Sequence, residues 1–262
     1  MIGSARQRLE LIGQLTIRDI AAKYQGSMLG LIWAALSPLL TVVMYTFLFS
    51  YVFQARWGPS EQSHVQYGVI IYAGLIVHAC FMDVLNRATA CILGHANLVK
   101  KVVFPTQIIP VVVVASALFH FLLSLTILVL MLFFTGDGPP LSALVYPLVL
   151  LPAVLYLLGL AWGLSALGVY VRDLPQIMPL LGNVLLFAGP VLYPREALPT
   201  AMQPWLLLNP ITFPVEQSRA LLFGQGPLDL AGLTVYVLLA VVCAGAGWTF
   251  FIKTRKGFAD VL

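Results

Sequence analysis

Charged side chains are scarce in this sequence, and over long distances they are missing altogether. Asp, Glu, Lys and Arg make up 9% of the residues, against 60% that are hydrophobic. Six stretches contain none of the four: 24–55, 62–82, 102–136, 138–171, 174–194 and 230–252. About 20 apolar residues in a helix cross the roughly 30 Å hydrocarbon core of a bilayer, and each stretch is long enough. The shortage of charge excludes an ordinary soluble fold and predicts an all-α membrane protein with six transmembrane helices.

Other absences narrow the function. The dipeptide Gly-Lys does not occur, so the chain has no G-x-x-x-x-G-K-[ST] loop to hold nucleotide phosphates. If transport here uses ATP, a separate subunit must bind it. The cysteines are only Cys80, Cys91 and Cys243, an odd number that predicts no disulfide framework. No Cys/His spacing indicates a metal site, and no basic patch with interleaved aromatics points to nucleic acid.

The basic residues that remain are distributed unevenly between the two sides. With a cytoplasmic N-terminus, only Arg56, Arg195 and Arg219 of the 14 Lys and Arg residues fall outside. The cytoplasmic set comprises Arg6, Arg8, Arg18, Lys23, Arg87, Lys100, Lys101, Arg172, Lys253, Arg255 and Lys256. Cytoplasmic loops of membrane proteins carry an excess of Lys and Arg. The pattern therefore predicts that both termini are cytoplasmic.

The apolar runs divide a single transmembrane domain, 1–262, into spans. We expect these spans at about 29–53, 65–85, 104–134, 141–170, 174–190 and 230–252. Pro38 should kink the first span or mark a local break in it. Residues 4–25 repeat apolar side chains at helical spacing opposite a polar face, which predicts an amphipathic helix in the cytoplasmic interface. The alternative is a solvated helix that leads into the first span.

The segment 191–228 is apolar but rich in proline. Its prolines are Pro194, Pro199, Pro204, Pro210, Pro214 and Pro227. Such a density rules out one straight spanning helix, and irregular backbone at membrane depth persists only inside protein or beside a wet cavity. We therefore expect short re-entrant helices between spans five and six, which would form an external gate.

Ionisable residues inside the predicted spans are few. Asp83 and Arg87 stand one helical turn apart with the acid first, which suits a structural ion pair. His78 and Asp83 have the H-x-x-x-x-D spacing used by membrane acyltransferases, in which a histidine and a carboxylate activate a hydroxyl. Five residues is a poor fit to one helical face, and no companion motif follows. We expect His120, in the third span, to make a contact between helices.

Several motifs resemble those of one transporter family. Residues 18–39 read R-D-I-x-x-K-Y-Q-G-S-x-L-G-x-x-W-x-x-x-x-P-L, which resembles the opening of the permease subunits of type-2 ABC exporters for polysaccharides. V-R-D-L at 171–174 is similar to their turn between spans four and five. P-V-L-Y-P at 190–194 and L-N-P at 208–210 are similar to their external re-entrant region. Gln25 departs from the pattern, because relatives often carry a second basic residue there.

The resemblance implies a function and a set of partners. Such permeases form homodimers in the bacterial inner membrane, above two ATP-binding cassette subunits that bind ATP and Mg. They export a lipid-linked polysaccharide on an undecaprenyl anchor, such as capsule, teichoic acid or the O-antigen used in lipopolysaccharide biosynthesis. This chain would then be a transport subunit without enzymatic activity or a cofactor of its own, and O-antigen is its expected substrate.

The resemblance also assigns roles to residues. The ATPase-coupling surface would comprise Arg18, Lys23, Asn97, Leu98, Val99, Lys100 and Lys101. The channel and external gate would comprise Tyr45, Phe49, Phe187, Tyr193, Pro194 and Asn209. One alternative is a drug or lipid exporter permease of the same fold, which often carries a larger external domain than the ten residues 54–63. A membrane acyltransferase using His78 and Asp83 is the alternative from another class.

Overall fold

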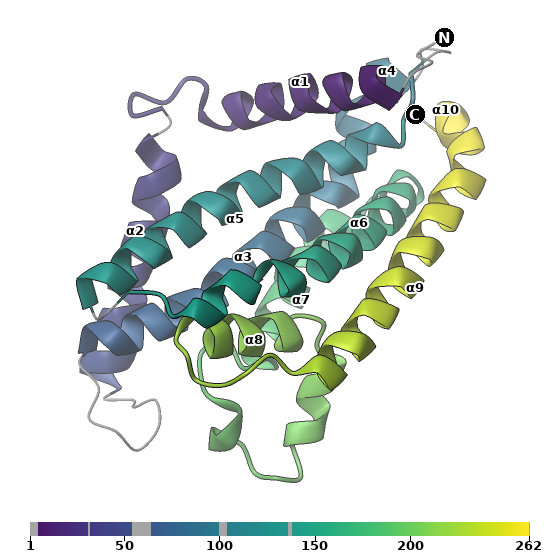
Figure 1. The fold of residues 1–262 in the computed structure, drawn as a ribbon. Helices are drawn as coiled ribbons and strands as arrows, with labels where there is room; N and C mark the ends of the chain where they lie inside the picture. The colour runs from purple at the N-terminus through teal and green to yellow at the C-terminus, as the bar shows by residue number, and fades with distance from the viewer. Residues whose placement is uncertain (1–4, 31, 54–63, 100–103, 136–137, 262) are drawn as a thin grey trace.

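The computed structural model of the chain describes residues 5–30, 32–53, 64–99, 104–135 and 138–261. These residues are helical almost throughout and contain no strand (Figure 1). The α-helices are α1 Ala5–Tyr24, α2 Ile32–Tyr45, α3 His64–Gly94, α4 Ala96–Val99, α5 Ile108–Thr135, α6 Pro147–Tyr170, α7 Leu174–Phe187, α8 Thr212–Leu222, α9 Leu230–Thr254 and α10 Phe258–Val261. A π-helical turn, Thr46–Val52, continues α2, and 3-10 turns occupy Leu141–Val145, Arg195–Ala197, Gln203–Leu208 and Arg255–Gly257.

Five helices of the described part are long and apolar enough to cross a bilayer. They are Ile32–Val52, Val65–Gly94, Ile108–Phe134, Leu141–Tyr170 and Leu230–Gly257. The prediction of an all-helical protein with several membrane spans is therefore confirmed. The remaining predicted span, 174–190, corresponds to α7, whose 14 residues fall short of the about 20 that a perpendicular crossing needs.

Two helix boundaries differ from the predicted ones for local reasons. The second span was expected to end near Leu85, but α3 continues to Gly94. The charges of Asp83 and Arg87 do not end the helix, because the two side chains pair within it. The third span was expected from 104, but α5 begins at Ile108. Pro105 precedes this start, where the Ile108 N–H donates to the Pro105 carbonyl at 3.0 Å.

The first span also departs from its expected form. The helix α2 runs on through Pro38, and the change of geometry comes later, at the π-helical turn Thr46–Val52. The Thr41 hydroxyl donates to the Ser37 carbonyl at 2.9 Å in the turn next to the proline. Thr46 packs directly on Gly68 of α3, where a Cβ would stand only 1.8 Å from its hydroxyl oxygen. This close contact places the end of the first span against α3.

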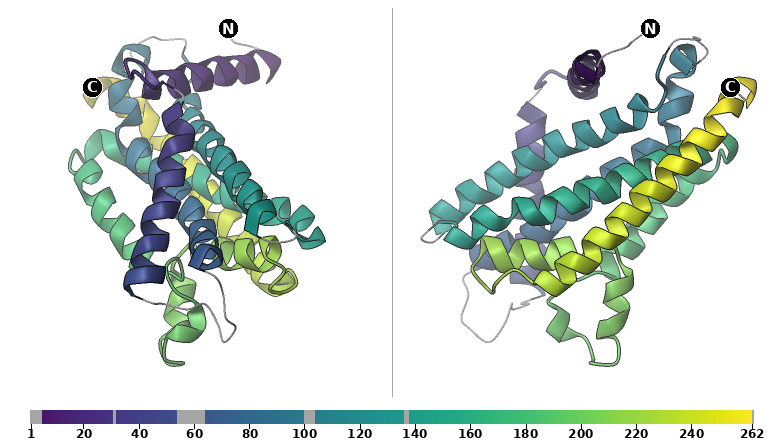
Figure 2. Two further views of the ribbon diagram at one scale, coloured as in Figure 1. Left: turned by 90° about the vertical axis from the view of Figure 1, so that its left-hand side faces the viewer. Right: turned by 45° about the vertical axis from the view of Figure 1, so that its right-hand side comes forward.

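The helix α3 forms the axis of the bundle. It contacts α2, α5, α6, α7 and α8, and it is the most buried of the five candidate spans. Beside it, α6 and α9 cross closely over most of their length, as the views in Figure 2 show. Small residues allow this crossing, because a Cβ at Gly159 would lie 2.5 Å from the carbonyl carbon of Cys243. Small residues bring helices close together in membrane proteins.

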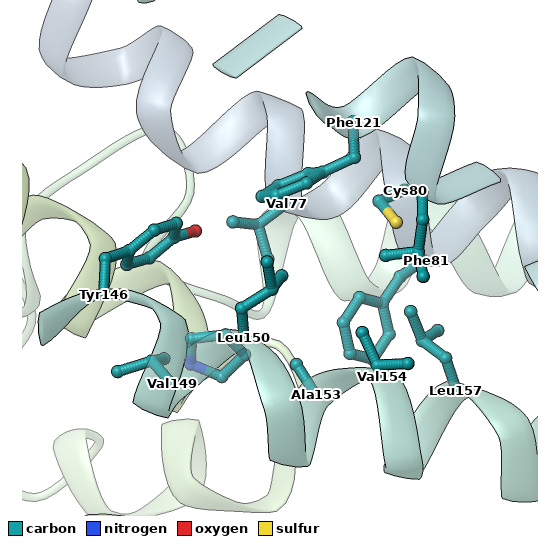
Figure 3. A pocket seen from close by; sticks show the side chains of 12 residues that line it. Val77, Cys80, Phe81, Phe121, Tyr146, Val149, Leu150, Ala153, Val154 and Leu157 are labelled. Carbon is teal, nitrogen blue, oxygen red and sulfur yellow. The ribbon is translucent and has the colours of Figure 1, made fainter. Parts of the chain in front are cut away.

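The two ends of the bundle differ. The helix α1 lies across one end, where α10 is also found, and α8 lies at the opposite end with the 3-10 turns of 195–208 (Figures 1 and 2). Between α3, α5 and α6 a cavity of about 20 Å³ is lined by apolar side chains and the Tyr146 ring (Figure 3). A cavity of this size has room for about one water, so it cannot hold a substrate.

Candidate functional site

The corner between α1 and α2 depends on two glycines of the 18–39 motif. Gly26 and Gly30 have φ angles of +85° and +50°, a region that L-residues with side chains rarely adopt. Turns of this kind let the chain leave α1 and enter the first span in a new direction. The motif therefore places α1 across the end of the bundle.

Four charged side chains of alternating sign link α1 to α3. Arg87 of α3 pairs with Asp19 of α1, and its Nη1 lies 3.3 Å from Asp83 Oδ2 one turn earlier. The second oxygen of Asp83 accepts a hydrogen bond from Lys23 of α1 at 3.4 Å. The four side chains are 22% to 43% exposed, and partly buried ion pairs are screened less than those on open surface. This charge network, Asp19, Lys23, Asp83 and Arg87, holds α1 in place.

The helix α5 is joined to the same region by polar contacts. Arg87 also donates to the Ser116 hydroxyl at 3.3 Å. The Tyr24 hydroxyl lies 3.2 Å from His120 Nδ1, and the two rings meet edge to face at 5.7 Å. Burial raises the pKa of Tyr24, and the nearby Asp83 carboxylate raises it further, so the phenol stays protonated. His120 thus makes a contact between α5 and α1.

A cavity of about 390 Å³ opens between α1 and the neighbouring ends of α3, α4 and α5. It is lined by Leu15, Arg18, Asp19, Ala22, Gly94, His95, Asn97, Ile109, Val112 and Val113. Arg18 and Asn97, which lie far apart in the sequence and were both predicted for the coupling surface, share this cavity. The α5 residues that line it are apolar, and Arg18, Asp19, His95 and Asn97 add polar groups, which suits a protein partner with an amphipathic contact surface.

The remaining predicted coupling residues are only partly described. Lys23 belongs to the charge network. Leu98 and Val99 lie in the short helix α4, with side chains outside the described part of the structure. Lys100 and Lys101 lie outside the described residues altogether. The coupling role of all these residues stays a prediction.

The predicted channel and gate residues fall into two groups. Tyr45 and Phe49, at the end of the first span, stack with ring centroids 6.1 Å apart. Phe187, Tyr193, Pro194 and Asn209 gather around the end of α7. There the Tyr193 hydroxyl donates to the Phe187 carbonyl at 2.7 Å. The buried Asn209 side chain donates to the Leu185 carbonyl at 2.9 Å and accepts from the Ile211 N–H.

His78 and Asp83 point to different partners. His78 Nε2 donates to the Gly182 carbonyl of α7 at 3.0 Å, whereas Asp83 bonds Lys23 and Arg87. A histidine engaged in this way is not positioned by that carboxylate, as an acid–base pair would require. His78 instead links α3 to α7.

Reasoning from the sequence did not give Asp19 or Arg219 a role. Asp19 was noted only as part of the 18–39 motif, yet it is the α1 partner of Arg87. Arg219, in the apolar segment 191–228, is 4% exposed and donates to backbone carbonyls of α3 and of the turn that follows α7. The available signal was a cation in an apolar segment that carries only two, Arg195 and Arg219, since ionisable residues at membrane depth are usually functional.

Comparison with known proteins identifies the family. Residues 10–223 match the family described as ABC-2 type transporter. An O-antigen export system permease protein of Myxococcus xanthus is 29% identical over 252 residues, which cover 95% of this chain and 94% of that protein. A Klebsiella pneumoniae protein of the same description is 26% identical over 254 residues, covering 97% and 95% of the two chains. These matches confirm the resemblance seen in the motifs, and the chain belongs to the ABC-2 type transporter membrane family.

Proposed function

We propose that this chain is the membrane-spanning subunit of an ATP-driven exporter that moves a lipid-linked polysaccharide of the O-antigen class. The observation that carries the proposal is the similarity over almost the whole chain to proteins named as O-antigen export permeases. The transport would cross the bacterial inner membrane, with α1 and both termini on the cytoplasmic side. The excess of Lys and Arg on that side supports this orientation.

We infer six spans from the same orientation. With α1 and α10 at one end of the bundle (Figure 1), the chain between them would cross an even number of times. The five long helices would supply five crossings, and α7, although only 14 residues long, would be the sixth span. The segment 191–228 would then be the external re-entrant gate. Its two 3-10 turns and α8 are compatible with short helices that enter and leave the outer leaflet.

The proposed function implies two kinds of partner. ATP and Mg would bind two separate ATP-binding cassette subunits docked at the α1 end, where Arg18 and Asn97 line the 390 Å³ cavity. A push on α1 would reach α3 and α5 through the charge network and the Tyr24–His120 contact. The second partner would be another copy of the chain. The first span leaves a large apolar surface, including Val43, Phe47 and Tyr51, that a second copy could cover to form the channel.

The acyltransferase alternative is not proposed, because His78 and Asp83 are engaged with different partners. The export function is tested by deleting the gene for this chain in its host and fractionating the polysaccharide. We expect lipid-linked polymer to accumulate inside the cell and to return to the surface when the chain is supplied again. Unchanged surface polysaccharide after the deletion would reject the proposal.

A further inference from the structure

Arg219 of α8 is the most deeply buried charged side chain of the described residues, with 4% exposure. Its Nε donates to the Ile70 carbonyl of α3 at 3.1 Å. Its Nη1 and Nη2 donate to the carbonyls of Pro190 and Val191, in the turn that follows α7. One planar guanidinium therefore bonds the backbone of two other segments, and its fork geometry fixes their relative position.

Gly74 makes this arrangement possible. It lies one turn after Ile70 in α3 and faces the guanidinium directly. A Cβ at Gly74 would stand 2.5 Å from Arg219 Nη2 and 3.1 Å from the Val191 carbonyl oxygen. A side chain there would push away both the arginine and the turn, so only glycine lets all three meet.

The guanidinium of Arg219 has both neutral and charged neighbours. The three acceptors named above are backbone carbonyls, and the Glu216 carboxylate, one turn earlier in α8, also acts on its charge. Burial lowers the pKa of Arg219 to about 9, with Glu216 opposing the shift, so the side chain is charged at neutral pH. Burying a cation is costly, and apolar residues often stabilise such a place as well or better. An apolar residue could not, however, make the three hydrogen bonds that join α8 to α3 and to the turn after α7.

The stretch 195–208, between α7 and α8 in the sequence, contains no α-helix. The helical turns of residues 195–208 are all of the 3-10 type, and they expose Trp205 and Leu208 to 70% and 75% while Leu206 between them is buried. Both ends of the stretch are tied to α7, through the Tyr193 hydroxyl on one side and the Asn209 amide on the other. The residues on either side of 195–208 are thus fixed to α7, whereas Trp205 and Leu208 within the stretch are exposed.

We propose that Arg219 is a positioning residue which, with Gly74, forms a joint that makes α8 move as one body with α3 and the end of α7. Opening at this end of the bundle would then take place within residues 195–208. The inference rests on the proposed export function, because it assigns to the gate of that exporter a fixed part and a moving part.

The joint is tested by thiol labelling of the full chain in membranes with its ATPase subunit. Cys80, Cys91 and Cys243 are first replaced by alanine, and Ser218→Cys, at a fully buried position of α8, serves as the probe. Loss of buried hydrogen bonds increases local opening, so R219Q should raise the labelling rate about tenfold or more. R219K keeps the charge but not the fork and should fall between R219Q and the unaltered joint.

A glycine pair provides a matched comparison that leaves the arginine in place. G74A should raise labelling as R219Q does, and the double variant should be no faster than the faster single variant, because both break one joint. G245A, which adds a methyl group where nothing lies within 4 Å, should leave labelling unchanged. Leu207→Cys, which lies outside the joint, should label at the same rate in every background.

The possible results distinguish a failure of the proposed joint from a failure of the proposed export function. Ser218→Cys labelling that stays slow in R219K and G74A, whether or not R219Q inserts normally, would overturn the joint. Faster labelling together with a loss of polysaccharide export at normal protein levels would support it. Faster labelling in a chain whose unaltered form exports no polysaccharide would keep the joint and reject the proposed function.

Discussion

At the scale of single residues, Arg87 is where three helices meet. It bonds Asp19 of α1, Asp83 of its own helix and Ser116 of α5. Its side chain is 27% exposed, so these contacts are partly shielded from water and salt. Within the charge network, removing the guanidinium would leave two carboxylates and Lys23 as the one remaining cation.

The variant Arg87→Met tests this arrangement, since methionine keeps the length and the helix propensity of arginine. We expect the free energy of unfolding in SDS titration to fall by about 2–3 kcal/mol, as for a broken set of charged hydrogen bonds. The control is Arg6→Met, which breaks an exposed pair with Glu10 and should change stability by less than about 0.5 kcal/mol. An equal change in the two variants would show that the charge network stabilises the chain no more than an exposed ion pair does.

Glu216 gives a pH dependence whose sign follows from its surroundings. Burial raises the pKa of Glu216, Glu196 and Asp229 act in the same direction, and Arg195 and Arg219 oppose the shift. Below the ordinary carboxyl pKa both folded and unfolded forms hold the proton, and the residue has no effect. As the pH rises toward the elevated pKa of the folded form, the unfolded form ionises first, so stability is lost.

Glutamine at position 216 cannot ionise, so the Glu216→Gln variant should not lose this part of its stability as the pH rises. Thermal unfolding of the purified chain at pH 4 and pH 7 should show a smaller decrease for the variant than for the natural protein. A natural protein that becomes more stable than the variant as the pH rises would mean that the two arginines outweigh burial.

At the scale of elements, the crossing of α6 and α9 is a close helix contact that depends on small residues. A Cβ at Gly159 would press on the α9 backbone at Cys243, whereas a Cβ at Gly163 would meet nothing nearer than 3.9 Å. Gly159→Ala should therefore destabilise the chain by about 1–3 kcal/mol through overpacking. Gly163→Ala should be neutral or stabilising by up to about 1 kcal/mol, since alanine is the better helix former. SDS titration measures the free energy of unfolding of the two variants. An equal decrease in both would show that Gly159 is not a point of close approach between α6 and α9.

The helices themselves could largely be predicted, because long charge-free runs are a direct signal of membrane helices. Their ends could not be predicted as well. The charge-free run 62–82 stops twelve residues before Gly94, the last residue of α3. The helix continues past the run because Asp83 and Arg87 neutralise each other inside it. The π-helical turn at Thr46–Val52 was also missed, since its packing on Gly68 is a tertiary contact with no local pattern.

The candidate site was predictable only in part for the same reason. Apolar spacing predicts an amphipathic helix over residues 4–25, but not which partners its polar face meets. Asp19 and Arg87 are 68 positions apart and Tyr24 and His120 are 96 apart, so periodicity cannot reveal these pairs. Arg18 and Asn97 were assigned to one surface by family resemblance, and the cavity between α1 and α4 shows that they are neighbours.

At the scale of the whole molecule, α3 connects the two ends that the function requires. Near one end it carries Asp83 and Arg87, which bind α1, and toward the other it carries Ile70 and Gly74, which receive Arg219. A helix rises about 1.5 Å per residue, so the two contacts are roughly 20 Å apart along one rigid element. Under the proposed function, a movement of α1 by a partner would reach α8 through α3.

The most direct test of the account is transport by the purified components. The chain and its ATP-binding subunit are reconstituted into vesicles with lipid-linked polysaccharide, and the polymer that becomes protected from added glycosidase is measured. We predict protection only when both subunits, ATP and Mg are present, and no ATP hydrolysis by the chain alone. Protection that is equally fast without ATP, or ATP hydrolysis by the chain without its partner, would contradict the central claim.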